Sequence, residues 1–308
     1  MKPVEEAFAS RSFRRVVLPG IVLTIGIHPL ISGVLRNTIG LYGVGEGAVL
    51  LAGEVVFWGL VVSSAVNWLY YVYEGFRLPW LTESVRMRNE RLVAETSSTL
   101  SALMATYETW SNLDRDRASK LYETLLDFPL RRTPDNVPIH YASRANRLGN
   151  IIATYEQYTE TRYGIDGVYY WFHLLQWAPA AAKADFDDSY DFAESLVITS
   201  FSGALIAIIH VLMCVGFAIA RLTGFAPISL PVGAFGSFVL FLMGVAINVM
   251  FYYLALPAHR EAGKIFRALV DASLPTLVEF IQKAPTSVDQ DLALRASQIR
   301  RYQSDLRS

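Results

Sequence analysis

Four long apolar runs constrain this chain more than any other feature of its sequence. They form two pairs separated by a long, mostly polar stretch, and they cover Val16 to Leu35, about Ala48 to Tyr73, Leu196 to Ala220 and about Leu230 to Leu256. Each run reaches or exceeds the roughly 20 residues that a helix needs to cross a hydrocarbon core of about 30 Å. Because hydrocarbon offers the backbone no hydrogen-bond partner, such runs are best satisfied as spanning helices. The sequence therefore predicts an all-α integral membrane protein with four transmembrane helices in two hairpins.

The remaining segments are also expected to be helical. A loop is predicted only at residues 128–138, where three prolines forbid a continuous helix. Periodicity and caps predict helices over Leu81 to Asp127, over Ala142 to Thr161, after a cap at Asp166, over His259 to Lys283 and over Ser287 to Leu306. The chain then divides into a cytoplasmic N-terminal segment (1–15), transmembrane hairpin 1 (16–73), a cytoplasmic helical domain (74–193), transmembrane hairpin 2 (194–256) and cytoplasmic C-terminal helices (257–308).

Basic residues predict the orientation of the four spans. Arginine and lysine are concentrated on cytoplasmic flanks. The two short turns hold Arg36 and Arg221, whereas the other flanks hold many more, namely Lys2, Arg11, Arg14, Arg15, Arg77, Arg86, Arg88, Arg91, Arg260, Lys264 and Arg267. We therefore expect a multi-pass protein of the cell (inner) membrane with both termini cytoplasmic.

The most distinctive stretch lies between the two pairs of runs. It reads Asn146-Arg147-Leu148-Gly149-Asn150, then Glu156, then Arg162-Tyr163-Gly164-Ile165-Asp166-Gly167. In a structural interpretation, Arg147 and Arg162 each bind a carboxylate such as Glu156 or Asp166. In a functional interpretation, Arg147, Asn150 and Arg162 bind an anionic ligand or a lipid head group, because guanidinium matches phosphate geometry. Structural ion pairs are the commoner use of such arginines.

With this stretch the chain resembles a family of uncharacterised bacterial integral membrane proteins. That family carries a similar Arg-Leu-Gly-Asn, Glu, Arg-Tyr-Gly-x-Asp series between two transmembrane helix pairs, and Tyr73-Glu74-Gly75 is similar to it as well. Ala145 and Asn146 stand where a proline and a threonine are expected. The resemblance implies the two-pair layout and brings no activity with it.

Polar residues in and beside the spans are candidates for an ion pathway, since each costs free energy in lipid. Glu54, Asn67 and Glu74 belong to the second run and its end, and Asn248 belongs to the fourth. Asn67 and Glu74 are seven residues apart and share a helical face, so they could line a vestibule for cations. The alternatives are a snorkelling Glu54 near the outer interface and a solvated Glu74 paired with Arg77.

An acidic run precedes the third span. It contains Asp185, Asp187, Asp188, Asp191 and Glu194. It lacks the glycine and the terminal glutamate of a calcium loop, so no metal site is expected. In a monomer, Asp185 or Asp187 would cap the helix. In a homo-oligomer, copies of the run would form an acidic pore mouth that concentrates cations.

Other functional classes lack support in the sequence. No phosphate-binding glycine loop, metalloprotease motif or nucleophile elbow occurs, so neither an enzyme nor a cofactor is expected. A net charge of −1 gives no basic excess for nucleic acid. We expect an oligomeric ion channel or pore with a cytoplasmic vestibule. The alternatives are a membrane-anchored sensor or effector that binds a cytoplasmic partner or an anionic ligand, and a membrane scaffold.

Overall fold

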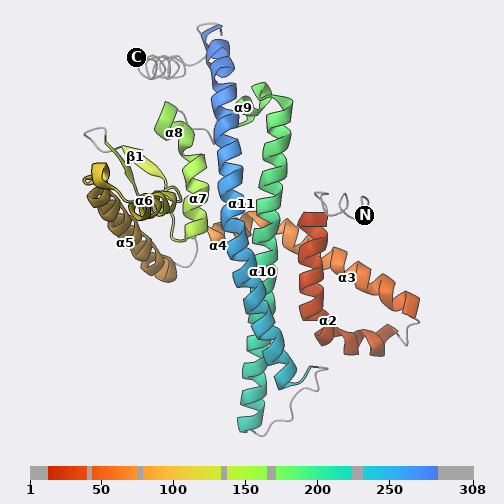
Figure 1. Ribbon diagram of the computed structural model, residues 1–308. Helices are drawn as coiled ribbons and strands as arrows, with labels where there is room; N and C mark the ends of the chain where they lie inside the picture. Colours follow the sequence, from red (N-terminus) through yellow and green to blue (C-terminus); the bar gives the residue numbers. More distant parts are fainter. Residues whose placement is uncertain are drawn as a thin grey trace. The chain divides into compact units, whose positions relative to one another are not determined.

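The computed structural model describes residues 13–39, 44–74, 79–132, 137–164, 171–223 and 232–283 (Figure 1). The predicted cap Asp166, the predicted partner Arg77 and the predicted helix over Ser287 to Leu306 lie outside these residues. The chain forms two compact units, one from Met1–Tyr70 and Tyr190–Pro257 and the other from Tyr71–Ser189 and Ala258–Ser308. We call them the first unit and the second unit.

The first unit contains the apolar helices. Within the described residues, four helical stretches are long and apolar enough to cross a membrane: Phe13–Ser32, Gly47–Ser64, Ala180–Thr223 and Ala234–Thr276. The prediction of a mostly helical chain with four candidate spans is confirmed. The elements are a π-helical turn η1 (Phe13–Val17) and the α-helices α2 (Leu18–Ile39), α3 (Val44–Ser64), α4 (Val66–Tyr73), α10 (Ala180–Thr223) and α11 (Ala234–Lys283).

Two predicted helix boundaries are wrong. Helix α10 begins at Ala180 rather than after a cap at Asp185 or Asp187, and α11 continues through the stretch that was expected to form a separate helix from His259. Sequence reasoning placed the breaks where apolar residues give way to polar ones. Helix propensity does not change there, because alanine, leucine, glutamate and lysine all favour helix. The residues from His259, expected to form a separate helix, therefore continue α11 without a break.

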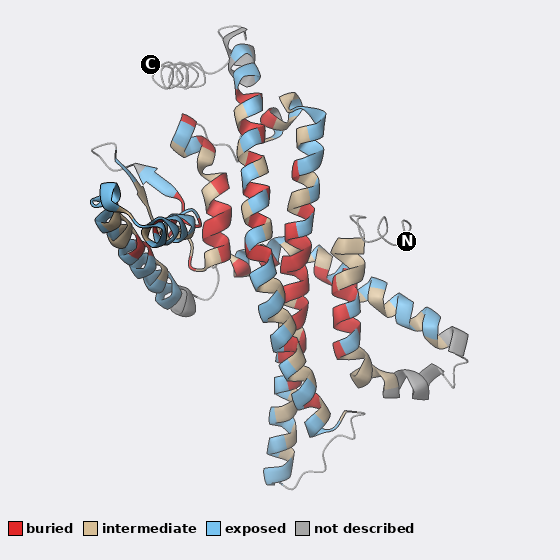
Figure 2. Ribbon diagram, in the orientation of Figure 1, coloured by how far each residue is buried: buried red, intermediate tan, exposed pale blue. Residues whose placement is uncertain are grey.

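Close backbone contacts fix how the helices of the first unit pack. A side chain at Gly20 would collide with the Val55 carbonyl of α3, and Gly203 of α10 and Gly244 of α11 face each other's backbones in the same way. Glycine permits such close approach between membrane helices. Figure 2 shows buried residues in α2 and along the middle of α10, while α3 is mostly exposed.

Contacts between α2 and α10 show that these two helices run in the same direction. Arg15, just before α2, contacts Asp191 near the first third of α10, and Gly26 further along α2 meets Ile206 and His210 further along α10. The ends of α2 and α10 that lead into the two short turns therefore lie toward the same end of the first unit.

The second unit combines short helices with one small sheet. Its own elements are α5 (Pro79–Met104), η2 (Tyr107–Thr109), α6 (Asn112–Leu125), β1 (Leu130–Arg132), β2 (Pro138–His140), α7 (Arg147–Glu156), α8 (Tyr158–Tyr163) and α9 (Trp171–Trp177). The predicted single helix over Leu81 to Asp127 is broken. Ser111 begins α6 with a capping box that includes Asp114, and this signal was present in the sequence.

The all-α prediction is also wrong in one place. The predicted loop at residues 128–138 contains β1, which pairs with β2 in antiparallel register, Leu130 opposite His140 and Arg132 opposite Pro138. Proline has a fixed φ and no backbone N–H, so it is accepted at the first residue of a strand or on an edge strand. Strands of three residues are too short to show alternation, which explains why the pattern gave no strand signal.

Aromatic packing holds the second unit together around the last part of α11. Phe266 stacks on Trp171 with ring centroids 4.9 Å apart and contacts Tyr155 of α7 at 5.5 Å. A side chain at Gly263 would meet the Tyr155 ring at 2.7 Å, so α7 lies close against α11. This contact holds the C-terminal end of α7, the helix that begins with the distinctive sequence series.

Candidate functional site

The start of α7 is built by the Asn146 to Asn150 series. The Asn146 side chain caps the helix by accepting a hydrogen bond from the Gly149 amide at 2.7 Å, and it donates to the Tyr73 carbonyl. Gly149 leaves room for the Glu74 backbone, whose carbonyl oxygen would lie 2.6 Å from an added Cβ. Asn150 is fully buried, and its amide bonds the backbone of Arg144 and Asn146 at 2.7 to 2.9 Å. These residues order the local backbone, and the Asn150 side chain is not available to a ligand.

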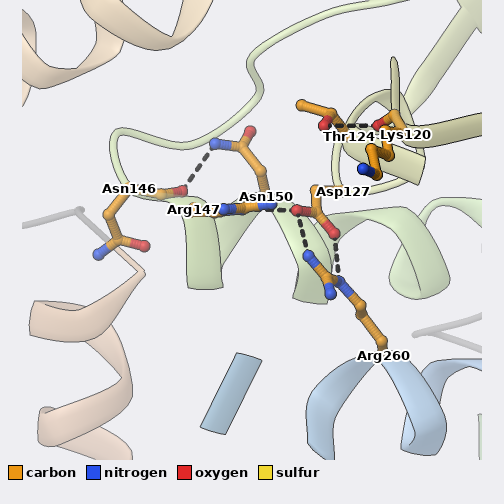
Figure 3. A network of polar contacts seen from close by, with 7 residues as sticks. All are labelled: Lys120, Thr124, Asp127, Asn146, Arg147, Asn150 and Arg260. Atoms are coloured by element: carbon orange, nitrogen blue, oxygen red, sulfur yellow. Dashed lines mark hydrogen bonds and ion pairs between the residues drawn. The ribbon is translucent and has the colours of Figure 1, made fainter. Parts of the chain in front are cut away.

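Arg147 belongs to a buried cluster that the sequence interpretation missed (Figure 3). Asp127, at the end of α6, has no exposed surface and accepts hydrogen bonds from Arg147 Nε at 2.5 Å and from Arg260 Nε and Nη2 at 2.5 and 2.7 Å. The predicted partners of Arg147 were Glu156 and Asp166, and the observed partner is Asp127. We call Asp127, Arg147 and Arg260 the Asp127 cluster. The basic residue Arg260 had been noted only as a topology signal.

Two glutamates come together beside the Asn146 cap. Glu156 contacts Arg144 Nη2 at 3.7 Å, and the charges of Glu74, Glu156 and Arg144 act on one another. Burial, helped by the neighbouring Glu156 carboxylate and opposed by Arg144, raises the pKa of Glu74 to about 7. Burial also raises the pKa of Glu156. Glu74 therefore titrates near neutral pH.

Asp271 of α11 binds two tyrosine hydroxyls from α8. Tyr158 donates at 2.8 Å and Tyr163 at 2.6 Å. Burial and the hydrogen bond to Asp271 raise the pKa of both phenols, that of Tyr163 to about 12, so both stay protonated donors. The guanidinium of Arg162 lies 5.5 Å from the centre of each tyrosine ring, and Gly164 ends α8 in the left-handed region with φ 68°.

Arg162 also borders a cavity of about 470 Å³, which we call the arginine cavity. Its polar side is formed by His140, Thr154, Gln157, Thr161, Arg162 and Arg267. Its apolar side is formed by Tyr122, Leu126, Phe128, Pro129, Leu130 and Pro138. None of the described residues that line it is acidic. The Arg267 guanidinium lies 6.0 Å from the Tyr158 ring and donates from Nε to the Gly263 carbonyl at 3.2 Å. The lining of the cavity therefore combines positive charge with apolar residues.

A second cavity of about 590 Å³ lies beside α5 and β2. Its one arginine, Arg131, lies over the Tyr141 ring at 5.2 Å, and its lining includes the carboxylate of Glu90. Opposite charges line this cavity, so it favours an anion less than the arginine cavity does.

The predicted pore residues have different partners in the described structure. Glu54 is partnered by His28 of α2, whose Nδ1 lies 3.0 and 3.2 Å from the two carboxylate oxygens. Asn248 joins α11 to α10 by donating to the Ser200 carbonyl at 2.9 Å. Asn67 is exposed on α4, and Glu74 belongs to the second unit. Each therefore has a different environment.

The predicted acidic run is split in the same way. Asp191 and Glu194 are buried and paired with Arg15, with Nη2 of Arg15 3.1 Å from the Asp191 carboxylate. Asp185 and Asp188 are exposed, and Asp187 is half-buried. Because α10 begins at Ala180, neither Asp185 nor Asp187 lies in its first turn, and the predicted capping role is wrong.

No family model, curated protein or solved structure matches this chain. The resemblance to bacterial membrane proteins noted above therefore stays a prediction. Functional proposals rest on the geometry of the described residues.

Proposed function

We propose that this chain is a multi-pass membrane protein whose second unit faces the cytoplasm and binds a small anionic molecule in the arginine cavity. The membrane part would consist of two hairpins, the first with α2 and α3 and the second with α10 and the apolar part of α11. The shared direction of α2 and α10 supports this topology, because it puts both short turns toward one side. The protein would act as a membrane-anchored sensor or effector.

The main support for this proposal is the set of residues that line the cavity. Arg162 and Arg267 come from different helices, yet both border one space in which no described lining residue is acidic. A volume of about 470 Å³ suits a small molecule, and sites of this kind are mostly apolar with a few polar groups that fix orientation. The planar guanidinium fork of arginine can bind two oxygens of a phosphate or a carboxylate at once. The ligand class is therefore a phosphate- or carboxylate-bearing molecule with an apolar body.

Phenyl phosphate, inorganic phosphate and phenol are suitable probes, because together they separate the charge from the apolar body. We expect phenyl phosphate to bind the purified full chain at least tenfold more tightly than either other probe, measured by isothermal titration calorimetry. The R267Q and R162Q variants should each lose at least tenfold. The matched control R86Q changes an exposed arginine outside the cavity, which pairs with Glu83 at 2.9 Å, and should bind normally. Equal binding in R267Q, R162Q and the wild type would reject the proposal.

A second candidate is the oligomeric ion channel, and the exposed Asn67 favours it. Asn67 lies on the apolar helix α4. This helix follows α3, in which the side chains of Phe57 and Leu60 are 57 and 55 % exposed. An amide in lipid tends to hydrogen-bond to another helix, and a second copy could provide one. In nanodiscs, cryo-EM should then resolve a ring with a polar axis. N67L should reduce assembly, while S64A should not, because Ser64 already bonds its own helix at 2.7 Å. A monomer in both wild type and S64A would reject this candidate.

A further inference from the structure

The contact of α2 with α3 carries a short line of polar groups within the apolar first unit. Thr24, His28 and Ser32 are spaced four residues apart, so they share one face of α2. That face meets α3, because His28 binds Glu54 and Gly20, one turn before Thr24, meets the Val55 backbone. An apolar helix pair needs no such line for packing.

His28 and Glu54 form an acid–base pair in the middle of this line. Nδ1 lies 3.0 Å from a Glu54 oxygen, and the side chains are 40 % and 13 % exposed. A carboxylate acceptor at this distance favours the tautomer with the proton on Nδ1, which leaves Nε2 as an acceptor on the more exposed edge. Ionisable residues within spans mark proton and ion pathways more often than they stabilise the fold.

Thr24 provides a second, independent observation. Its side-chain hydroxyl is buried, with the residue 4 % exposed, and has no hydrogen-bond partner among the described residues. A buried hydroxyl without a partner is costly, so it normally binds a water molecule or another polar group. One turn from an acid–base pair, such a water would extend a hydrogen-bonded chain from Glu54 toward Thr24.

A second group of polar residues lies at the other end of the helix pair. Ser63 of α3 donates to the Arg15 carbonyl at 2.5 Å, and Arg15 is held by Asp191 and Glu194 of α10. Ser32 and Arg15 are about 25 Å apart along η1 and α2 at the helical rise of 1.5 Å per residue, comparable to the hydrocarbon thickness. Between Thr24 and Arg15 the two helices face each other with apolar residues (16–23 and 55–62), so a proton would cross this stretch on transient water.

We propose that the His28/Glu54 pair relays protons across the membrane between α2 and α3. A proton from water binds His28 Nε2 and gives an imidazolium. The imidazolium then transfers its Nδ1 proton to the Glu54 carboxylate, and the acid passes that proton to water beside Thr24. One proton is taken up and one is released, and the net charge of the pair alternates between −1 and 0. The imidazole then carries its proton on Nε2, and a rotation of the ring that turns this protonated nitrogen toward Glu54 restores the starting state.

Other charged and titratable groups lie on the elements that pack against α2 and α3. From α10 these are His210, whose Nε2 bonds the Gly26 carbonyl at 2.9 Å, and the acids Asp191 and Glu194, which bind Arg15. From η1 there is a further charged residue, Arg14. None of them makes a hydrogen bond to the His28 or Glu54 side chain among the described contacts. The relay therefore depends on the pair itself, needs only one copy of the chain and is independent of the arginine cavity.

The test is proton flux into liposomes that contain the full chain and a trapped pH-sensitive dye, driven by a potassium diffusion potential. We expect wild-type flux at least tenfold above empty liposomes. E54Q and H28Q should each reduce it at least tenfold, and T24V at least threefold. The controls E261Q, at an exposed acid paired with Lys264, and T223V, at a hydroxyl bonded to its own helix, should match the wild type.

The conservative variant E54D distinguishes a relay from a structural role, because it keeps a carboxylate and should retain at least a third of the flux. If E54Q does not reconstitute, H28Q and T24V decide the test. Wild-type flux no higher than that of empty liposomes would overturn the proposal. Unchanged flux in H28Q and T24V would overturn it equally.

Discussion

Asp127 in the second unit and Glu54 in the first are both carboxylates held largely away from water, but the chain neutralises them differently. Asp127 has no exposed surface and receives three hydrogen bonds from two permanently charged guanidinium groups. Glu54 is 13 % exposed and is paired with the imidazole of His28, which is charged only when protonated. Arginine fixes the charge of its partner, whereas histidine lets it change. The first arrangement suits structure, and the second suits proton transfer.

The largest expected effect comes from removing the Asp127 carboxylate. D127N leaves two guanidinium groups without their common charged acceptor. Because these side chains are 39 and 40 % exposed, water offsets part of the loss, and we expect a cost of about 2 to 3 kcal/mol from the lost hydrogen bonds to a charged group. We expect the midpoint of thermal unfolding of the detergent-solubilised chain to fall strongly. D116N changes an exposed acid of the same helix and should leave the midpoint unchanged. Equal midpoints for D127N and D116N would show that the cluster is not structural.

The two arginines of the Asp127 cluster should differ in their effects. Arg260 donates two hydrogen bonds to Asp127 and Arg147 donates one. Each hydrogen bond to a charged group contributes about 1.5 to 3 kcal/mol. R260M should therefore destabilise the second unit more than R147M, by about 1 to 2 kcal/mol in chemical unfolding. The reverse order would contradict the observed hydrogen-bond geometry.

Glu74 should make the stability of the second unit depend on pH. Its pKa rises from an ordinary 4.5 to about 7 in the folded chain, so the folded state binds the proton more tightly than the unfolded state. The associated stability is fully present below about pH 4.5 and is lost as pH rises toward 7. Because the side chain is partly solvated, we expect a loss of only about 1 kcal/mol. E74Q should remove this dependence, as measured by unfolding midpoints at pH 5 and pH 8.

The smallest effect is expected from E54Q on stability. Glutamine keeps one hydrogen bond to His28 and removes a charge that is costly in lipid, so the free energy of unfolding should change by less than about 1 kcal/mol. Thermal unfolding in detergent measures this change against D127N. A loss as large as that of D127N would mean that the His28/Glu54 pair is a structural ion pair like the Asp127 cluster.

Local sequence signals predicted part of the candidate site. Asn146 and Asn150 were recognised as part of a distinctive series, and the structural interpretation of Arg147 as one half of an ion pair agrees with its position beside Asp127. Its partner was misassigned because Asp127 lies 20 residues away, across a pair of strands that gave no pattern. The arginine cavity could not be predicted, since Arg162 and Arg267 meet only through the packing of α8 against α11.

The four long apolar helices could be predicted from the sequence alone, because composition over about 20 residues is enough to favour a helix that can cross hydrocarbon. The sequence also contained the caps of α6 and α7, which depend on residues three positions apart. Which charged side chains contact one another depends on the tertiary structure. His28 contacts Glu54, which is 26 residues away in the sequence, and Arg260 contacts Asp127, which is 133 residues away. Such pairs depend on the register and crossing of helices, which are set by close contacts such as Gly20 with Val55 and Gly263 with Tyr155. Local periodicity carries no information about that register, so the partners of the buried charges appear only after packing.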